Sequence, residues 1–476
     1  MIISESLSDD YGVGGTTDHL YPLARPTISI LPDDVLLEIF NFCVDQYRLD
    51  AWHTLVHVCQ RWRHVVFGSP RRLDLQLLCT NRRSVMKMLD IWPALPIYIY
   101  AITNAMLLPG VANVIAALKQ HDRVCGINIP DVPNSLLTEF AAMEEPFPAL
   151  TSLFLGSNDE NAPVLPDSFL GGSAPRLRQL SMSGIPFPAL PKLILSTTDL
   201  VHLTLYNIPH SGYISPDAMV NCLSALTRLN SMSLEFRSPQ SRVNRESRRL
   251  RLPQRVVFPA LTSLRFRGDD EYLEDIASRI HAPLLESIVI ILFNRLIFDT
   301  PMLRHFISRI ETFDAPYRAK ISISTFHIVV DIFQNSETAL PKVLGLYILC
   351  QPFDWQLSSL AQVCSSALPP LPTLEWLEIY KSRDRPPQWQ NDIENMQWLE
   401  LLHPFTSVRE LVLSEDLVPL VAPALQELTG ERVTEVLPAL QNIFLRGPRI
   451  SGPVKKALKV FTTARRLSGR PVTVHN

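Results

Sequence analysis

The feature that most constrains the fold of this 476-residue chain is a short apolar unit that recurs along most of its length. The unit reads x-Leu-x-x-Leu-x-Leu, with substitutions by other apolar residues. The apolar positions of the clear copies are Val124/Ile127/Ile129, Leu150/Leu153/Leu155, Leu177/Leu180/Met182, Leu200/Leu203/Leu205, Leu229/Met232/Leu234, Leu261/Leu264/Phe266, Leu285/Ile288/Ile290, Leu374/Leu377/Ile379, Val408/Leu411/Leu413 and Leu440/Ile443/Leu445. Weaker copies fit at Ile321/Ile323 and Val343/Leu346/Ile348.

Each unit predicts one short strand with one buried face, because successive strand residues point to opposite sides. Most steps between neighbouring copies span about 23 to 34 residues, which is typical of leucine-rich repeats. A single repeat cannot bury its apolar face, whereas stacked repeats share one continuous core. Proline-led segments such as Pro148-Ala149-Leu150 end the preceding helix. We therefore expect an α/β fold in which residues 71–452 form a curved leucine-rich-repeat-like solenoid with a parallel concave sheet.

Residues 453–476 have the pattern of a closing element. The spacing predicts a helix over 453–467, followed by a last strand near 471–474. Val454, Leu458 and Phe461 are expected to face inward. The basic residues expected to face outward are Lys455, Lys456, Arg465 and Arg466.

The N-terminal part differs from the repeats. Residues 1–28 are polar and are expected to form a flexible tail. Residues 29–70 predict three short helices, the first beginning at Leu31-Pro32-Asp33-Asp34, where acidic residues suit the positive end of a helix. The apolar positions of this first helix form a stripe wide enough for two contact surfaces. The segment is therefore expected to be either a small helical cap or a docking module.

Composition excludes several classes of protein. A hydrophobic fraction of 46% excludes a disordered chain, and a net charge of -3 does not favour a nucleic-acid coat. The densest apolar run, Ile288–Phe293, is too short to span a membrane. The N-terminus has no secretory-signal pattern, and the seven scattered cysteines are expected to be reduced and buried. We expect no membrane or nucleic-acid partner and a cytoplasmic or nuclear location.

Residues 31–66 resemble the F-box family. The resemblance lies in Leu31-Pro32 with its acid pair, then Leu36 and Ile39-Phe40, then Val58-Cys59-x-x-Trp62-Arg63. With the repeats that follow, the chain is similar to fungal-type F-box proteins with degenerate leucine-rich repeats. The segment between Phe42 and Asp50 is longer than the family pattern, and the closing Leu-Trp pair is absent.

The resemblance implies a function. The chain would be the substrate-recognition subunit of an SCF-type cullin-RING ubiquitin ligase, docking a Skp-type adaptor through the F-box and a protein substrate through the repeats. The residues it assigns to the adaptor are Leu31, Pro32, Leu36, Ile39, Phe40, Val58 and Trp62. The alternative is a non-catalytic scaffold whose F-box serves a non-degradative complex.

Two features suggest where a substrate would bind. Several arginines, among them Arg245, Arg248, Arg249 and Arg251, gather in one insertion and suit an acidic or phosphorylated segment, although they also fit a solvated loop. Trp389 follows two prolines and is expected to be an exposed anchor or a loop residue, whereas Trp376 is interpreted as a core residue.

The sequence contains no pattern that predicts catalysis. His53 and His57 have the spacing of a zinc pair on a helix, but no set of further ligands accompanies them, so we interpret them as surface residues. Nucleophile-elbow, phosphate-loop and metalloprotease motifs do not occur. We expect no enzyme activity, no cofactor and no metal.

Overall fold

A computed structural model describes residues 28–43, 51–101, 108–239, 255–293, 298–311, 316–334, 342–349, 356–382, 394–447 and 451–475. The chain divides into two units, Met1–Gln76 and Leu77–Asn476. The predicted boundary lies at residue 70, and the buried residues Leu73 and Leu75 fall on the helical side of the division.

In its described residues, 28–43 and 51–76, the first unit contains one turn of 3-10 helix and three α-helices. These are η1 (Ile28–Ile30), α1 (Asp33–Cys43), α2 (Trp52–Val56) and α3 (Gln60–Gly68). Asp33 and Asp34 lie in the first turn of α1, where their charges stabilise the helix end. The core is built by side chains with no exposed surface: Leu36, Phe40, Trp52, Val56 and Val66. Burying each large apolar side chain contributes roughly 1.5–3 kcal/mol.

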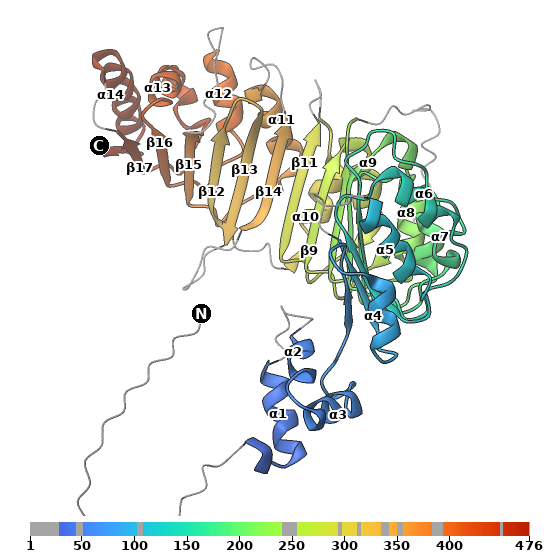
Figure 1. Ribbon diagram of the computed structural model, residues 1–476. Helices are drawn as coiled ribbons and strands as arrows, with labels where there is room; N and C mark the ends of the chain where they lie inside the picture. Colours follow the sequence, from blue (N-terminus) through green and yellow to red (C-terminus); the bar gives the residue numbers. More distant parts are fainter. Residues whose placement is uncertain are drawn as a thin grey trace, which may run out of the picture. The chain divides into compact units, whose positions relative to one another are not determined.

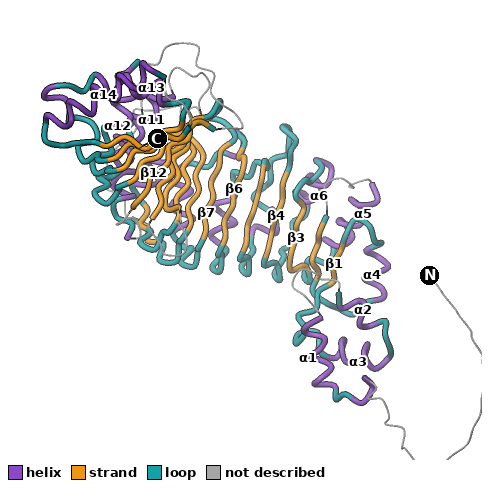
Figure 2. Tube along the Cα trace, turned by 90° about the vertical axis from the view of Figure 1, so that its left-hand side faces the viewer, coloured by secondary structure: helices purple, strands orange, loops and turns teal. Residues whose placement is uncertain are grey.

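The second unit is built on one large sheet, shown in Figures 1 and 2. Its strands are β1 (Leu77–Cys79), β2 (Ile97–Tyr100), β3 (Val124–Ile129), β4 (Ser152–Gly156), β5 (Gln179–Ser183), β6 (His202–Ile208), β7 (Ser231–Phe236), β9 (Ser263–Gly268), β11 (Ser287–Phe293), β12 (Pro316–Ile323), β13 (His327–Gln334), β14 (Lys342–Leu349), β15 (Trp376–Lys381), β16 (Glu410–Ser414), β17 (Asn442–Arg446) and β18 (Thr473–His475). A separate parallel pair joins β8 (Val256–Val257) to β10 (Ile280–His281).

The recurring apolar units coincide with the strands of this sheet. Every apolar position of the ten clear copies is buried, and each Leu-x-Leu pair lies within a strand. Neighbouring copies are in register: Leu153 pairs with Leu180, and Leu180 pairs with Leu203. The sequence thus predicts these strands and their parallel pairing. The second unit is a mixed α/β structure with a mostly parallel sheet.

The sheet departs from simple repetition in its middle. The strand order there is β11-β14-β13-β12-β15. Strand β12 therefore lies three positions from β11, and β13 and β14, which follow it in the chain, fill the two positions between them. Strand β13 is antiparallel to both of its neighbours. A tight turn joins β12 to β13, closed by hydrogen bonds from the Ser324 amide and hydroxyl to the His327 carbonyl.

Helices connect the strands and lie along one face of the sheet (Figure 1). They are α4 (Val85–Ile91), α5 (Leu108–Leu118), α6 (Asn134–Ala142), η3 (Phe169–Gly172), α7 (Leu190–Leu195), η4 (His210–Gly212), α8 (Pro216–Leu223), α9 (Asp270–Ala277), α10 (Pro301–Ile307), α11 (Gln356–Ala367), α12 (Asn395–Leu402), α13 (Val418–Gln426), η7 (Gly430–Thr434) and α14 (Gly452–Leu467). We call the opposite side of the sheet the open face.

The turns that follow the strands stack closely on one another. An added Cβ on Gly156, at the end of β4, would lie 2.2 Å from the carbonyl oxygen of Pro130 in the preceding turn. Gly184 has a positive φ of 67°, and its added Cβ would lie 2.2 Å from the carbonyl oxygen of Ser157. Glycine therefore sets the spacing of these turns.

The predicted last helix and strand are both present. Val454, Leu458 and Phe461 of α14 are buried as expected, and β18 pairs with β17. The prediction for Arg465 is wrong, because its side chain is fully buried. Its guanidinium donates hydrogen bonds to backbone carbonyls around the preceding turn, those of Val433, Leu437, Pro438 and Leu440.

Candidate functional site

The helical unit exposes several large apolar side chains. Phe42 is 87% exposed, Ile30 69%, Val58 56% and Val35 43%. Val35, the half-buried Ile39 and Phe42 recur at steps of four and three along α1, so they share one face of that helix. Exposed large apolar residues that share one face of a helix are a feature of surfaces that bind other molecules. We call Ile28, Ile30, Val35, Ile39, Phe42 and Val58 the exposed apolar set.

Arg61 of α3 fixes the segment that leads into α1. Its guanidinium donates to the Asp33 carboxylate, with Nε and Nη2 distances of 3.0 and 2.7 Å, and to the Leu31 carbonyl. Arg72 adds ion pairs of 3.2 Å to both Asp34 and Glu38. Arg61 therefore ties the Leu31-Pro32 segment to α3.

The residues assigned to the adaptor divide into two groups. Leu36 and Phe40 have no exposed surface, and the Phe40 ring packs 4.7 Å from the Trp62 ring, measured between centroids. In this structure they build the core, which corrects the expectation of direct contact. Pro32 and Val58 are exposed, and Leu31, Ile39 and Trp62 are half-buried. These five have surface that a partner could touch, and adaptor binding by them stays a prediction.

Sequence reasoning left Ile28, Ile30 and Phe42 out of the predicted contact set. The signal for Phe42 was present: it falls beside Val35 and Ile39 on α1, away from the buried Leu36 and Phe40. Ile28 and Ile30 were missed because they adjoin the polar tail, where no helical periodicity identifies a face.

On the open face of the sheet, a buried carboxylate lies among cations. The Glu378 side chain in β15 is 5% exposed and lies 2.5 Å from Arg318, 2.6 Å from Arg446 and 3.9 Å from Lys320. Three cations thus surround one carboxylate, which leaves a positive excess. A second buried carboxylate, Glu235 in β7, is 2.5 Å from Arg265.

Aromatic rings lie beside the Glu378 cluster. The Arg318 guanidinium lies 5.1 Å from the Trp376 ring centroid, Trp376 stacks on Phe444 at 6.0 Å, and Phe444 stacks on His475 at 4.7 Å. Trp376 is only half-buried and lies on the open face, so its interpretation as a core residue is wrong. Aromatic and arginine side chains are the types that most often anchor protein partners.

All of the predicted substrate contacts lie outside the described residues. These are Arg245, Arg248, Arg249, Arg251 and Trp389. Arg255, at the end of the same arginine-rich insertion, is described and exposed. Burial, followed by the charges of Arg309 and Arg255, lowers the pKa of His305, so these three basic groups lie near one another.

The histidine pair lies on and just after α2. The ring of His53 is half-buried, with its centroid 4.1 Å from that of Trp52, while His57 is exposed. Among the described residues, no group of three or more His, Cys, Asp or Glu side chains is placed to hold a metal ion. No helix in the described part of the chain is long and apolar enough to cross a membrane.

The cysteines do not all follow the expectation of burial. Cys79, Cys222 and Cys364 are buried, and burial raises the pKa of each thiol to about 12. Cys43 and Cys59 of the helical unit are exposed. Exposure of Cys59 follows from its position as the N-cap of α3, where its sulfur accepts a weak hydrogen bond from the Trp62 amide.

Two hollows lie near the end of the sheet. One, of about 370 Å³, is lined by residues after β15, β16 and β17 that include Lys381, Glu415, Asp416 and Arg446. The other, of about 680 Å³, runs along α14 opposite Thr429 and Gly430. The first has balanced charge, whereas the second is predominantly apolar with a basic border.

No family model matches the sequence, and no curated protein matches it. Among solved structures, one similar chain is the leucine-rich repeat-containing protein LegL7 from Legionella pneumophila. The two chains share 14% sequence identity with a TM-score of 0.26, over 84% of this chain and 99% of that one. A likeness of this size carries no weight for function, so the description of the fold rests on the strand order and register given above.

Proposed function

We propose that the chain is the substrate-recognition subunit of an SCF-type cullin-RING ubiquitin ligase. In this proposal residues 29–70 are an F-box that docks a Skp-type adaptor, and the sheet unit holds a protein substrate. The chain performs no chemistry itself. It raises the effective concentration of the substrate near the ubiquitin-conjugating enzyme, in the cytoplasm or the nucleus.

The observation that carries the proposal is the exposed apolar set on a helical unit with the F-box residue pattern. Leu31-Pro32 is held by Arg61, and Trp62 packs on Phe40, so the residues of the pattern have defined structural roles. The apolar side chains next to them are left at the surface. When a partner covers such side chains, the free energy of binding gains roughly 25 cal/mol per Å² of apolar area that is removed from water.

The open face supports the second half of the proposal. The Glu378 cluster with Trp376 and Phe444 combines positive charge and stacked rings on strands β12, β15 and β17. We propose that this region contacts the protein substrate, with the aromatic rings as anchors and the cations selecting an acidic segment.

Co-purification with a recombinant Skp-type adaptor and cullin tests the adaptor half. The informative variant is Phe42→Asp with Val58→Asp, because both residues are exposed and their substitution leaves the core intact. We expect at least a tenfold loss of adaptor affinity, since about 1.4 kcal/mol corresponds to a factor of ten. Ile91→Asp, at an exposed apolar residue of α4, is the matched control and should bind normally.

The outcomes separate the two readings of the first unit. If the wild type retains both the adaptor and the cullin and the double variant loses both, the result supports the proposal of a ligase subunit. Adaptor without cullin supports the alternative, a scaffold in a non-degradative complex. A folded wild-type chain that binds neither partner contradicts the ligase proposal and favours the scaffold, in which the helical unit serves another partner.

A further inference from the structure

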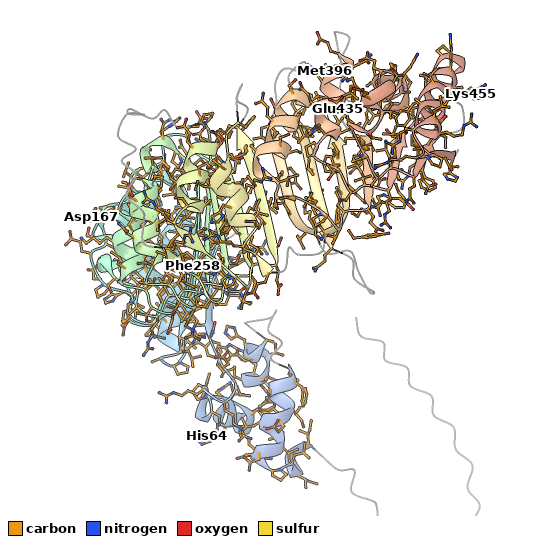
Figure 3. All side chains as sticks on the ribbon, turned by 180° about the vertical axis from the view of Figure 1, so that it is seen from behind. His64, Asp167, Phe258, Met396, Glu435 and Lys455 are labelled. Carbon is orange, nitrogen blue, oxygen red and sulfur yellow. The ribbon has the colours of Figure 1, made fainter. Side chains whose placement is uncertain are left out.

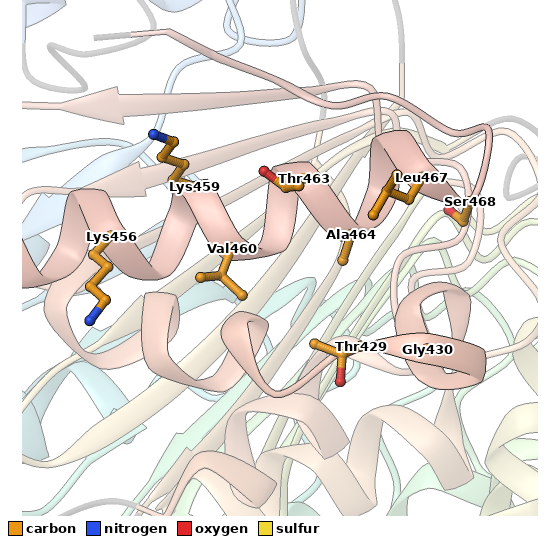
Figure 4. Close-up of a pocket in the computed structure, with 9 residues that line it drawn as sticks. All are labelled: Thr429, Gly430, Lys456, Lys459, Val460, Thr463, Ala464, Leu467 and Ser468. Atoms are coloured by element: carbon orange, nitrogen blue, oxygen red, sulfur yellow. The ribbon is translucent and has the colours of Figure 1, made fainter.

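The outer side of α14 forms one wall of a groove. Figure 4 shows Val460 and Ala464 pointing toward Thr429 and Gly430, which form the facing wall. Leu467, on the same stripe of α14, is 82% exposed. This stripe is distinct from the one that packs on the core, because Val454, Leu458 and Phe461 are buried. The groove is about 680 Å³ and its floor is mainly apolar.

The border of this groove is basic. Helix α14 carries Lys455, Lys456, Lys459 and Arg466 at its surface and has no acidic residue. Figure 3 shows Lys455 projecting from the helix, and Figure 4 shows Lys456 and Lys459 leaving opposite sides of the helix in that view. Within the described residues none of these four cations forms an ion pair with an acid. Glu431, next to Gly430, is the acid closest in sequence to the facing wall.

This concentration of charge is local. The whole chain has a net charge of -3, so α14 is a positive region on a mildly acidic protein. An acidic partner is therefore drawn to this helix rather than to the surface in general. Apolar contacts with Val460 and Leu467 would then fix its position.

We propose that this groove binds an acidic amphipathic segment of a partner protein. Val460 and Leu467 lie about 10 Å apart along the helix axis at 1.5 Å per residue, which matches two turns of a bound helix. Two apolar side chains of the segment cover Val460, Ala464 and Leu467, and its carboxylates face Lys456 and Lys459. This is the helix-in-groove mode of recognition.

Geometry favours a protein segment over a lipid surface. A basic helix with apolar residues can also lie on an anionic membrane. Here, however, Val460 and Ala464 are half-buried opposite a second wall, Thr429–Gly430, and a flat bilayer cannot enter between the two walls. The inference does not rest on the proposed ligase function, because α14 belongs to the sheet unit and not to the helical unit.

The test measures fluorescence anisotropy of a labelled synthetic peptide titrated with the full chain. The peptide has about four helical turns, with Leu at one face and Glu elsewhere. We expect binding that weakens as salt rises. Leu467→Ser and Lys456→Glu with Lys459→Glu should each weaken it at least tenfold. Leu195→Ser, at an exposed leucine of α7, is the matched control that should change it less than about twofold.

Several results would overturn the proposal. No binding at about 1 mM protein is one, since that excludes even a weak complex. Equal binding of a peptide with Lys in place of Glu excludes charge recognition. The peptide fails to bind in another such result, while phosphatidylserine vesicles bind the wild type and not the variant with Lys456→Glu and Lys459→Glu. This result would identify a membrane as the occupant of the groove. A dimer in light scattering that Leu467→Ser dissociates identifies a second copy of the chain.

Discussion

At the scale of single residues, Arg465 and Arg466 are neighbours with opposite environments. Arg466 is exposed, whereas Arg465 has no exposed surface and lies 5.9 Å from the Phe461 ring centroid. Burial, followed by the charge of Arg470, lowers the pKa of Arg465. The sequence contained the signal, because Val454, Leu458, Phe461 and Arg465 follow steps of four, three and four. Assigning a residue to the surface by its charge alone gave the wrong result.

We expect Arg465→Met to destabilise the chain by about 2–4 kcal/mol. The carbonyls of Val433, Leu437 and Leu440 would lose their buried charged donor. Arg466→Met should change stability by less than about 0.5 kcal/mol. Thermal unfolding followed by circular dichroism distinguishes them. Equal melting temperatures for the two variants would show that the buried hydrogen bonds contribute nothing.

The cysteines give a second prediction at this scale. A pKa raised to about 12 keeps Cys79, Cys222 and Cys364 as neutral thiols at pH 8, and thiolate forms only as the pH approaches that value. Cys43 and Cys59 are exposed. Brief iodoacetamide treatment of the native chain, followed by peptide mass spectrometry, should label Cys43 and Cys59 before the buried three. Early labelling of Cys222 or Cys364 would mean that the sheet unit opens readily.

At the scale of elements, the sequence predicts the regular strands well and the irregular ones poorly. The strands of the ten clear copies repeat the same apolar spacing, many of them after a similar lead-in. Strand β13 has a nearly continuous apolar run, Ile328–Val330, which indicates a strand but gives no direction. Its antiparallel pairing follows from the tight turn at Ser324–His327, which is too short for a crossover to a parallel strand.

The close stacking of turns leads to a prediction for glycine substitutions. Gly156→Ala should cost about 1–3 kcal/mol, because its Cβ would meet backbone atoms of Pro130 that cannot swing away. Gly452→Ala, in the first turn of α14, is the control, since nothing lies within 4 Å of its added Cβ. Urea unfolding compares the two. A neutral effect of Gly156→Ala would show that neighbouring turns can separate without loss of packing.

At the scale of the whole molecule, the sequence predicts the two kinds of structure in the chain but not which surfaces are open. Helical and strand periodicities depend on local spacing and are readable. The exposure of Phe42 and the position of Trp376 on the open face depend on how elements pack, so the candidate site was only partly predictable.

Each unit has its own buried apolar set, so we expect residues 77–476 to fold without residues 1–76. The fragment should keep the strand and helix signals in circular dichroism and melt within a few degrees of the full chain. On the proposed function, it should also fail to bind the adaptor. An insoluble or unfolded fragment would show that the sheet unit depends on the helical one.

The order β11-β14-β13-β12-β15 also has a consequence for biosynthesis. In the earlier part of the sheet each strand meets its partner soon after it is made, as Ser152 meets Gln179. Ile288, in the densest apolar run of the sequence, pairs with Leu344, roughly twice as far along the chain. While the ribosome adds the intervening residues, the edge of β11 has no partner and can pair with other chains. The nascent protein therefore passes through a vulnerable interval about two thirds of the way through its translation, when a chaperone would be most needed.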